Sequence, residues 1–562
     1  MIQDFRSASC PDALAADVCI IGAGPAGISL AMALAGSPWT VCLLEGGGTR
    51  AEAASQALYE GESVGPYAFD PSTSRLRALG GATQIWGGGC IPLAASEMAA
   101  RDWVPGGGWP IGREELSPYY EHANRLCAIE PGAIEDGAYR FDGAPSMPPA
   151  SPLQPRTSRS SSIDFSTYRE QLHKAAGVTA LLHANLLRLQ ATPQANAVGS
   201  ALIGSTDGRR GVVRARCFVL AAGGLENARL LLLSDDVARN GLGNDHGLVG
   251  RFFMDHPRCR LGTLRHPDIA RAVHRYERAQ GRAATPAFHH LCLTEDAQRA
   301  HRLLHARVRP FSIERDPPEG LAAMRALRAA LRRPPERDEA AQVEARLLDA
   351  LEHDVPQRQT IGEGRPGPLA LRSVRHADDI VRAALRKLAR RPVVDADRAE
   401  LVGYFEQAPN RDSRVALADS RDALGLRRIR VDWRMSAQDE ENIRRASRLI
   451  GDALAADLGA RFEPAGWLAD PAAPLPLHGT AHHMGTTRMS DSPATGVVDA
   501  QCRVHGIDNL YVAGSSVFPT GGWSFPTLTI IALALRIGDE LLRRLPDMPM
   551  VDAIPAPEPV PA

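Results

Sequence analysis

The sequence has almost no net charge and no long apolar run. Its 64 lysine and arginine residues nearly balance 65 aspartate and glutamate residues, so the formal net charge is −1 and the pI is near 7.0. This balance gives no general attraction to nucleic acid or to an anionic membrane. The apolar stretch at residues 528–535 ends at Arg536 and is too short to cross a bilayer. We therefore expect a buried helix there, no transmembrane segment and no nucleic-acid partner.

Paired cysteines and targeting signals are also missing. The nine cysteines include no C-x-x-C pair and no spacing of a small secreted domain, which indicates scattered reduced thiols rather than a disulfide or metal framework. Residues 1–16 contain no basic region followed by an apolar segment, and no twin-arginine pair. These absences predict a cytoplasmic protein.

The length of the chain predicts two domains, and a change in its composition predicts an insertion. A chain of 562 residues exceeds the usual size of one domain, so we expect two separate cores. Residues 301–400 are dense in Arg and Glu, and their periodicity predicts helices at Leu321–Leu331 and Ala340–Leu351. Such helices are typical of a solvated surface, with docking of a partner as the alternative. The proline-rich tail, 546–562, is predicted to be disordered.

A glycine turn near the N-terminus is typical of dinucleotide binding. The apolar run Val18–Ile21 predicts a buried strand, and three glycines follow it at the G-x-G-x-x-G spacing as a helix begins. They are Gly22, Gly24 and Gly27. Such a turn lets backbone N–H groups and the helix dipole meet a pyrophosphate. Glu45 ends a second strand, Thr40–Leu44, where its carboxylate suits a ribose hydroxyl and disfavours a 2′-phosphate. The turn alone leaves NAD and FAD open.

A second glycine-dense segment covers residues 75–92. It contains Leu79, Ile85 and Trp86, whereas flexible glycine linkers carry mostly serine and charge. We therefore expect backbone that approaches a ligand closely, with a flexible surface loop as the alternative. Farther along, alternation predicts an antiparallel meander, then a strand, a helix, two strands and a long helix. Their residues are 181–189, 199–206 and 211–218, then 217–222, 225–233, 414–417, 428–431 and 437–458.

Several ordered motifs together resemble one enzyme family. They are residues 17–48, 80–89, 184–186, 221–223, 250–257, 482–489 and 509–516. In this order they resemble the glucose/methanol/choline (GMC) family of FAD-dependent oxidoreductases over almost the whole chain. The C-terminal third is most similar to the bacterial sugar and polyol dehydrogenases and to pyranose oxidase. The resemblance selects FAD over NAD.

The resemblance implies an α/β fold, α+β overall. It consists of a Rossmann-like FAD-binding domain of the glutathione reductase type and a discontinuous, sheet-based substrate domain. On this chain, residues 1–255 and 478–545 would form the FAD-binding domain. Residues 256–477 would form the substrate domain, with the Arg-rich helical insertion at about 316–392.

The resemblance also implies which residues bind FAD. The glycine turn would hold the pyrophosphate, Glu45 the adenosine ribose, and Leu186 the adenine through its backbone. The glycine-dense segment would lie along the isoalloxazine and ribityl groups, and C-terminal residues would line the pyrimidine side. The implied set is Gly22, Gly24, Pro25, Ala26, Gly27, Glu45, Gly46, Gly81, Thr83, Trp86, Gly87, Gly88, Leu186, Ala222, Gly223, Gly514, Ser515, Pro526 and Thr527.

His482 is the predicted catalytic base. Oxidation of an alcohol moves a hydride from carbon to flavin N5, which is easier when a neutral imidazole accepts the hydroxyl proton. His482 precedes Gly485 by the three positions found for the family's active-site histidine. His483 is interpreted as structural. His478 and His482 have the i, i+4 spacing of a metal pair, but no third ligand accompanies them, so we predict no metal.

One departure from the family pattern concerns the residue before Pro526. The family usually places Asn or a second His there, and this chain has Phe525. A phenyl ring cannot hydrogen-bond a developing alkoxide, and one such contact contributes about 3 kcal/mol to transition-state stabilisation. Ser524 could replace it as a catalytic residue. Trp523 and Phe525 could instead stack on an apolar or aromatic substrate, with core packing as the alternative.

A second departure concerns how the flavin is attached. Some relatives carry Thr-His-Trp in the glycine-dense segment and link FAD covalently through that histidine. This chain reads Thr83-Gln84-Ile85-Trp86. We therefore predict noncovalent FAD.

These residues predict an FAD-dependent oxidoreductase that oxidises a CH–OH group of a small alcohol or sugar-like substrate, with His482 as base. The electron acceptor is left open among oxygen, a quinone and a cytochrome. Because of Phe525, one alternative is a biosynthetic flavoenzyme that desaturates, cyclises or eliminates. Another alternative is an FAD-containing subunit that docks a partner through the insertion.

Overall fold

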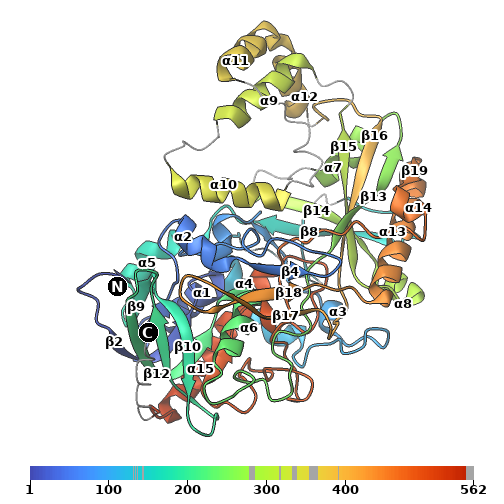
Figure 1. Cartoon of the computed structure of the whole chain (residues 1–562). Helices are drawn as coiled ribbons and strands as arrows, with labels where there is room; N and C mark the ends of the chain where they lie inside the picture. The colour runs from blue at the N-terminus through green and yellow to red at the C-terminus, as the bar shows by residue number, and fades with distance from the viewer. Residues whose placement is uncertain are drawn as a thin grey trace.

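Two large β-sheets organise the chain (Figure 1). The computed structural model describes residues 1–551 except 131, 133, 136, 142–144, 278–284, 315–317, 332–337, 353–364 and 390. Of the predicted tail, residues 545–547 form a short helical turn, and residues from 552 onward lie outside the described part of the chain.

The first sheet is mostly parallel and contains strands from both ends of the sequence. Its strand order is β1 (Ile2–Asp4), β9 (Val178–Leu182), β3 (Val41–Leu44), β2 (Ala13–Ile21), β12 (Arg210–Leu220), β11 (Val198–Gly204) and β10 (Asn185–Ala191), with β20 (Leu510–Val512) also paired to β12. The predicted meander is confirmed as β10–β11–β12, which pair antiparallel. Leu181 belongs instead to β9, because a turn at His183 separates it from β10.

Apolar helices cover this sheet. Helix α1 (Pro25–Leu34) packs against α15 (Thr527–Arg544), and α15 packs against α4 (Arg113–Leu126). The residues from Leu528 to Leu535 are almost all buried in α15, which confirms the expected buried helix. Helix α6 (Gly223–Leu233) leaves the end of β12 as predicted. Among the described residues, no helix is long and apolar enough to span a membrane.

The second sheet is antiparallel. Its order is β19 (Arg461–Pro464), β13 (Arg258–Arg265), β16 (Arg398–Phe405), β15 (Ala306–Ile313), β14 (Ala287–Leu293), β8 (Leu153–Ser160) and β5 (Gly89–Cys90). The long helix α13 (Ala437–Leu458) has the predicted bounds and packs on β13, β16 and β19. Its apolar residues Ile443, Ile450 and Leu454 join a core with Leu261 and Phe405 on one face of the sheet.

The sheets do not follow the predicted division at residue 255. Strand β8 lies in the second sheet, although it precedes that boundary. Strands β17 (Arg414–Arg421) and β18 (Arg427–Asp432) follow it, yet β18 pairs with β4 (Gly61–Val64) and β17 packs on α6. A buried ion pair of 2.6 Å between Arg229 of α6 and Asp422, which lies between β17 and β18, stabilises the contact of these strands with α6. The chain therefore crosses between the two layers more often than the sequence indicated.

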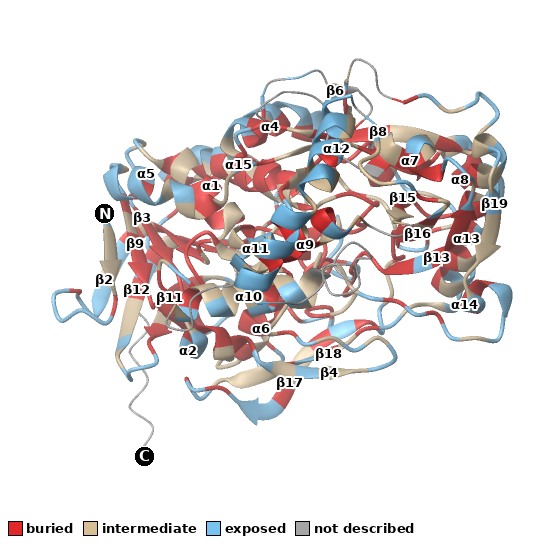
Figure 2. Ribbon diagram, turned by 90° about the horizontal axis from the view of Figure 1, so that it is seen from above, coloured by how far each residue is buried: buried red, intermediate tan, exposed pale blue. Residues whose placement is uncertain are grey.

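The Arg-rich insertion has two parts. Helices α9 (Glu319–Leu331), α11 (Pro366–Arg375) and α12 (Ala377–Leu388) pack together and stand apart from the body in Figure 1. Figure 2 shows much of α11 and α12 exposed. Helix α10 (Glu339–Glu352) instead lies on the body, where Leu347 is buried in a cluster with Leu76 and Ile85. The expected solvated surface thus fits α11 and α12 but not α10.

Candidate active site

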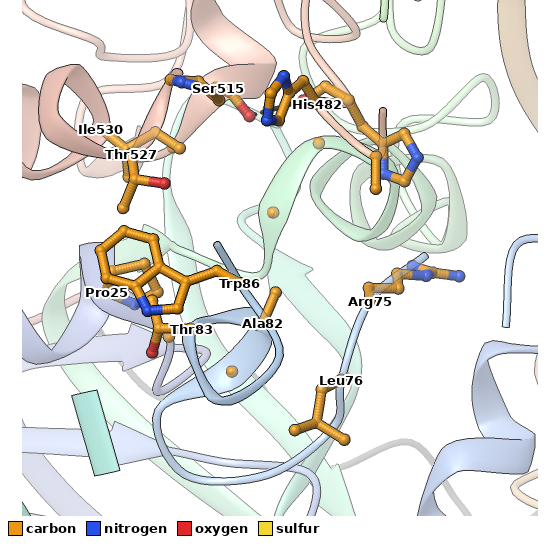
Figure 3. A pocket seen from close by; sticks show the side chains of 18 of the residues that line it. Pro25, Arg75, Leu76, Ala82, Thr83, Trp86, His482, Ser515, Thr527 and Ile530 are labelled. Carbon is orange, nitrogen blue, oxygen red and sulfur yellow. Dashed lines mark hydrogen bonds between the residues drawn. The ribbon is translucent and has the colours of Figure 1, made fainter. Parts of the chain in front are cut away.

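One large cavity lies where the two sheets meet. It encloses about 500 Å³ and is lined by the glycine turn after β2, the segment 75–92, the start of α6, strands β13 to β16 and the C-terminal segment. Figure 3 shows Pro25, Thr83 and Trp86 on one side of it and His482 and Ser515 on another. Segments far apart in the sequence therefore build one site.

The glycine turn is shaped by close packing on one side and open space on the other. Gly22 has φ +109°, and a Cβ there would approach the Ala221 carbonyl oxygen to 2.6 Å. A Cβ on Gly27 would overlap the Gly22 carbonyl, which explains a glycine at the β2–α1 junction. At Gly24 a Cβ would meet nothing within 4 Å. The N-terminus of α1 is thus left open toward the cavity, as an anion at a helix N-terminus requires.

Glu45 lies at the end of β3, on the cavity wall. Its carboxylate accepts hydrogen bonds from the Ala23 N–H at 3.1 Å and the Gly47 N–H at 2.8 Å. Burial raises the pKa of this carboxyl, and the two backbone donors and Arg77 oppose that rise. The backbone bonds fix the carboxylate beside the glycine turn.

Most predicted cofactor-binding residues line this cavity. Gly27 does not, because it packs between β2 and α1. Those on the wall are Gly22, Gly24, Pro25, Ala26, Glu45, Gly46, Gly81, Thr83, Trp86, Gly87, Gly88, Leu186, Ala222, Gly223, Gly514, Ser515, Pro526 and Thr527.

His482 also lines the cavity, and the backbone around it is held by a buried acid. The Asp255 carboxylate accepts from the backbone N–H of His482 at 3.0 Å and of His256 at 2.7 Å, and from the Thr480 hydroxyl at 3.0 Å. Burial raises the pKa of Asp255, while these hydrogen bonds favour its charged form. Asp255 thereby places two histidines side by side.

The hydrogen bonds of His256 decide which nitrogen of His482 is free. His256 Nε2 lies 3.3 Å from the Gly521 carbonyl, which can only accept, so Nε2 carries the proton. Burial lowers the pKa of His256 to about 4, so its Nδ1 is an acceptor at neutral pH. His482 Nδ1, 2.9 Å away, must then be the donor. Neutral His482 is therefore protonated on Nδ1 and keeps a lone pair on Nε2, which no described residue engages.

The electrostatic surroundings keep His482 neutral. Burial lowers its pKa well below the ordinary value, and the positive charges of His256, when protonated, and Arg307 lower it further. His483 also lines the cavity, but its ring stacks on Phe69 at 5.4 Å and lies 5.7 Å from Phe253, and burial lowers its pKa to about 3. This packing agrees with the structural interpretation of His483.

Phe525, Ser524 and Trp523 separate into different environments. Phe525 lines the cavity, with its ring centroid 6.1 Å from that of His482. Ser524 does not line it, and its buried hydroxyl has no hydrogen-bond partner among the described residues. Trp523 is buried in a cluster with Ile91 and Cys292. The geometry therefore supports substrate contact for Phe525 only.

Comparison with known proteins gives the family. The profile of the GMC oxidoreductases, in its C-terminal part, matches residues 409–534. The 2-methyl-1,2-propanediol dehydrogenase of Mycolicibacterium austroafricanum is 24% identical over 97% of this chain and 98% of its own length. The paromamine 6′-oxidase of Streptomyces fradiae is 25% identical over 82% of this chain and 77% of its own. The chain is thus similar to the GMC oxidoreductases.

Solved structures agree with this fold. The pyridoxine 4-oxidase from Mesorbium loti has a TM-score of 0.51 at 18% identity and covers 94% of this chain and 99% of its own. A formate oxidase variant of Aspergillus oryzae RIB40 has a TM-score of 0.53 at 16% identity, covering 96% and 100%. The predicted α/β fold is confirmed.

The cofactor is FAD, and the cavity fits it. The glycine turn leaves space before the N-terminus of α1, and a Cβ at Gly87 or Gly223 would likewise meet nothing within 4 Å. The enzyme is thus an FAD-dependent oxidoreductase, which confirms the main functional interpretation of the sequence. The relatives favour neither the lyase nor the docked-subunit alternative.

The sequence reasoning missed three residues of this site. Asp255 and His256 lie in the family motif at residues 250–257, directly before Pro257. That position was the signal that could have identified them. Nothing in the sequence singled out Arg307, which is one arginine among many and reaches the cavity only through the register of β15.

Proposed function

We propose that this enzyme oxidises the CH–OH group of a small alcohol or sugar-like substrate, with His482 as catalytic base. The observation that carries the proposal is the lone pair on Nε2 of His482, a residue that lines the cavity. The hydrogen bonds from His256 to the Gly521 carbonyl and from His482 to His256 leave this lone pair free. FAD supplies the hydride acceptor when bound. The relatives named above support the substrate class, since each is named for an alcohol or amino-sugar substrate.

The residues around His482 divide the work of moving one proton. Nε2 takes the hydroxyl proton of the substrate, which favours departure of the hydride from the same carbon. Asp255 holds the His482 backbone and lies near the imidazolium that forms, so its negative charge offsets part of the cost. Phe525 borders the substrate space and, with the walls of the cavity, excludes water.

We also propose the cofactor contacts. The open N-terminus of α1 would hold the pyrophosphate, Glu45 would accept from the adenosine ribose, and Leu186 would meet the adenine. The glycine-dense segment and the C-terminal residues around Ser515 would flank the flavin ring. FAD is proposed to be bound without a covalent link.

Replacing His482 tests the proposal. We expect His482→Ala to slow anaerobic bleaching of the flavin by about 100-fold or more, the usual contribution of a positioned base. The substrates are small diols, sugars and benzylic alcohols, and the oxidised flavin band is followed by stopped-flow absorbance. His301→Ala, at an exposed position on α8 (Glu295–His301), serves as the matched control and should bleach like the wild type.

An unchanged bleaching rate in His482→Ala with full FAD content would remove His482 from the mechanism. No bleaching of the wild type by any alcohol would remove the alcohol substrate itself. Reoxidation of the bleached enzyme by oxygen, by a quinone and by a cytochrome can then be compared, because relatives include both oxidases and dehydrogenases.

A further inference from the structure

Arg307 is a buried cation on the substrate side of the cavity. It lies on β15, is only 5% exposed and lines the cavity with Tyr404 and His290. Its Nη1 donates to His290 Nδ1 at 3.1 Å. Its Nε has no hydrogen-bond partner, and no carboxylate pairs with the guanidinium among the described residues. Burial lowers the pKa of Arg307 to about 10, so the group is still charged at neutral pH.

Sheet register, not a loop, places this cation. Arg307 pairs with Tyr404 on β16, which in turn pairs with Arg258 on β13, and all three residues line the cavity. Arg309, two residues along β15, lines the same cavity. The face of the second sheet toward the cavity is thus rich in arginine and aromatic groups.

An unpaired buried charge is costly, and the protein offsets only part of that cost. The guanidinium carbon lies 3.8 Å from the Tyr404 ring centroid and 5.0 Å from that of Phe525. Such cation–π contacts are favourable, but they do not supply the hydrogen-bond acceptors that a guanidinium needs. Buried charges are normally paired. None of the described residues supplies an acceptor for Arg307 Nε, which leaves the guanidinium available to an acidic ligand.

The position of Arg307 identifies which ligand. Phe525 contacts both the guanidinium and, across 6.1 Å, the ring of His482, so Arg307 borders the substrate space. The pyrophosphate site is elsewhere, at the glycine turn beside Glu45. A planar guanidinium binds a carboxylate through two parallel hydrogen bonds. We propose that the substrate is a hydroxy acid, whose carboxylate pairs with Arg307 while its CH–OH group meets His482.

This inference rests on the proposed function and names its substrate class. Tyr404, Phe525 and Phe288 line the same cavity, and Phe525 lies beside both Arg307 and His482, so an apolar or aromatic body suits the part of the substrate that joins the carboxylate to the alcohol. A neutral alcohol would leave the Arg307 charge without a partner after water is displaced.

Binding of matched non-oxidisable probes tests the inference without turnover. The probes are 3- and 4-methylbenzoate, C3–C6 n-alkanoates, and the neutral amide of each acid, titrated into the holoenzyme at pH 7 while the flavin band is followed. We expect at least one carboxylate to bind about tenfold or more tightly than its amide, as for a charge-assisted hydrogen bond. Arg307→Met should bring that ratio close to one, and Arg307→Lys should keep part of it. The matched control is Arg302→Met, a mostly exposed arginine, which should keep the full ratio.

Equal binding of every acid and its amide by the wild type would overturn the inference, whatever the variants do. A preference that survives intact in Arg307→Met would also overturn it. If Arg307→Met does not retain FAD, Arg307→Lys decides, since a ratio equal to the wild type's would contradict the assigned pairing.

The corresponding hydroxy acids, such as 4-(hydroxymethyl)benzoate, distinguish failure of the hydroxy-acid inference from failure of the proposed alcohol oxidation. If neutral alcohols bleach the flavin and no carboxylate binds more tightly than its amide, the proposed function stands and the hydroxy acid is excluded as the substrate. Carboxylate preference without bleaching by any alcohol or hydroxy acid would leave the pairing with Arg307 standing and remove both the proposed function and the hydroxy acid as its substrate.

Discussion

A backbone carbonyl, rather than a carboxylate, determines which of the two facing nitrogens of His256 and His482 carries the proton. Gly521 accepts from His256 Nε2, which turns His256 into an acceptor for His482 Nδ1. Both imidazoles are neutral because burial lowers the pKa of each. His256 is thus a positioning residue, since it acts on the substrate only through His482.

Changing His256 should impair the chemical step more than binding. In His256→Phe the imidazole acceptor for His482 Nδ1 is lost and only the Thr480 hydroxyl, 3.1 Å away, remains, so the tautomer is held less firmly and we expect kcat for flavin bleaching to fall about tenfold to 100-fold. KM should change much less. His256→Asn can present its side-chain oxygen as an acceptor and should recover part of the rate. Equal kcat values for the Phe variant and the wild type would contradict this role.

At the scale of elements, helix α10 acts as a cover over the cavity. Leu348 and Leu351 line the cavity, and Leu347 is buried against Leu76 of the glycine-dense segment. The helix is held at its start by an Arg50–Asp338 ion pair of 3.0 Å and by the bond from the Ala53 N–H to Glu339. The pattern predicted a helix here, but the same amphipathic pattern also suits α11 and α12, which do not touch the cavity.

Disrupting α10 should loosen the cofactor. Leu347→Glu buries a charge in an apolar cluster, so we expect the helix to lift and FAD to dissociate about tenfold faster or more. The release is measured as the gain of free-flavin fluorescence on dilution. Leu371→Glu makes the same change on α11, where the leucine is 72% exposed, and should release FAD like the wild type. Equal rates for the two variants would mean that α10 does not retain the cofactor.

The glycine-dense segment carries the prediction of noncovalent flavin. It has Gln84 and Ile85 between Thr83 and Trp86, and no histidine occurs in residues 75–92 to form a link. Acid precipitation should therefore leave the yellow colour in the supernatant. Colour that stays in the washed pellet would show a covalent bond to another residue.

At the scale of the whole molecule, buried neutral histidines make the fold sensitive to acid. The pKa of His256 is about 4 in the fold and 6.5 in the unfolded chain, so the unfolded state binds the proton first as the pH falls. The free energy of unfolding contributed by this group is complete above pH 6.5 and is lost between pH 6.5 and 4. His483, with a pKa of about 3, acts in the same direction.

This linkage can be measured on one variant. Between pH 7 and pH 5 the wild type should lose about 2 kcal/mol more unfolding free energy than His256→Asn, which has no group to protonate there. Urea unfolding with excess FAD at both pH values provides the comparison. The same loss in both proteins would mean that His256 is not the group that titrates.

Local patterns were sufficient to predict the cofactor-binding half of the site. The strand, the glycine turn, the helix and Glu45 follow one another within about thirty residues, and backbone geometry fixes their arrangement. The same holds for α13, whose capping box at Ser436 and C-terminal Gly459 mark its ends. His482 was likewise predicted from a local spacing, since it precedes Gly485 by three positions.

The sequence by itself thus determined the cofactor-binding turn and the candidate base from residues close together along the chain, and the fold class and FAD from the order of several motifs along it. Only the tertiary structure decided that His256 meets His482 across 226 positions, that α10 rather than α11 covers the cavity, and that Arg307 looks into it. These contacts depend on sheet register and on which helix face finds a partner. A shift of one residue in β15 would turn Arg307 to the other face of the sheet, and no local pattern encodes that choice.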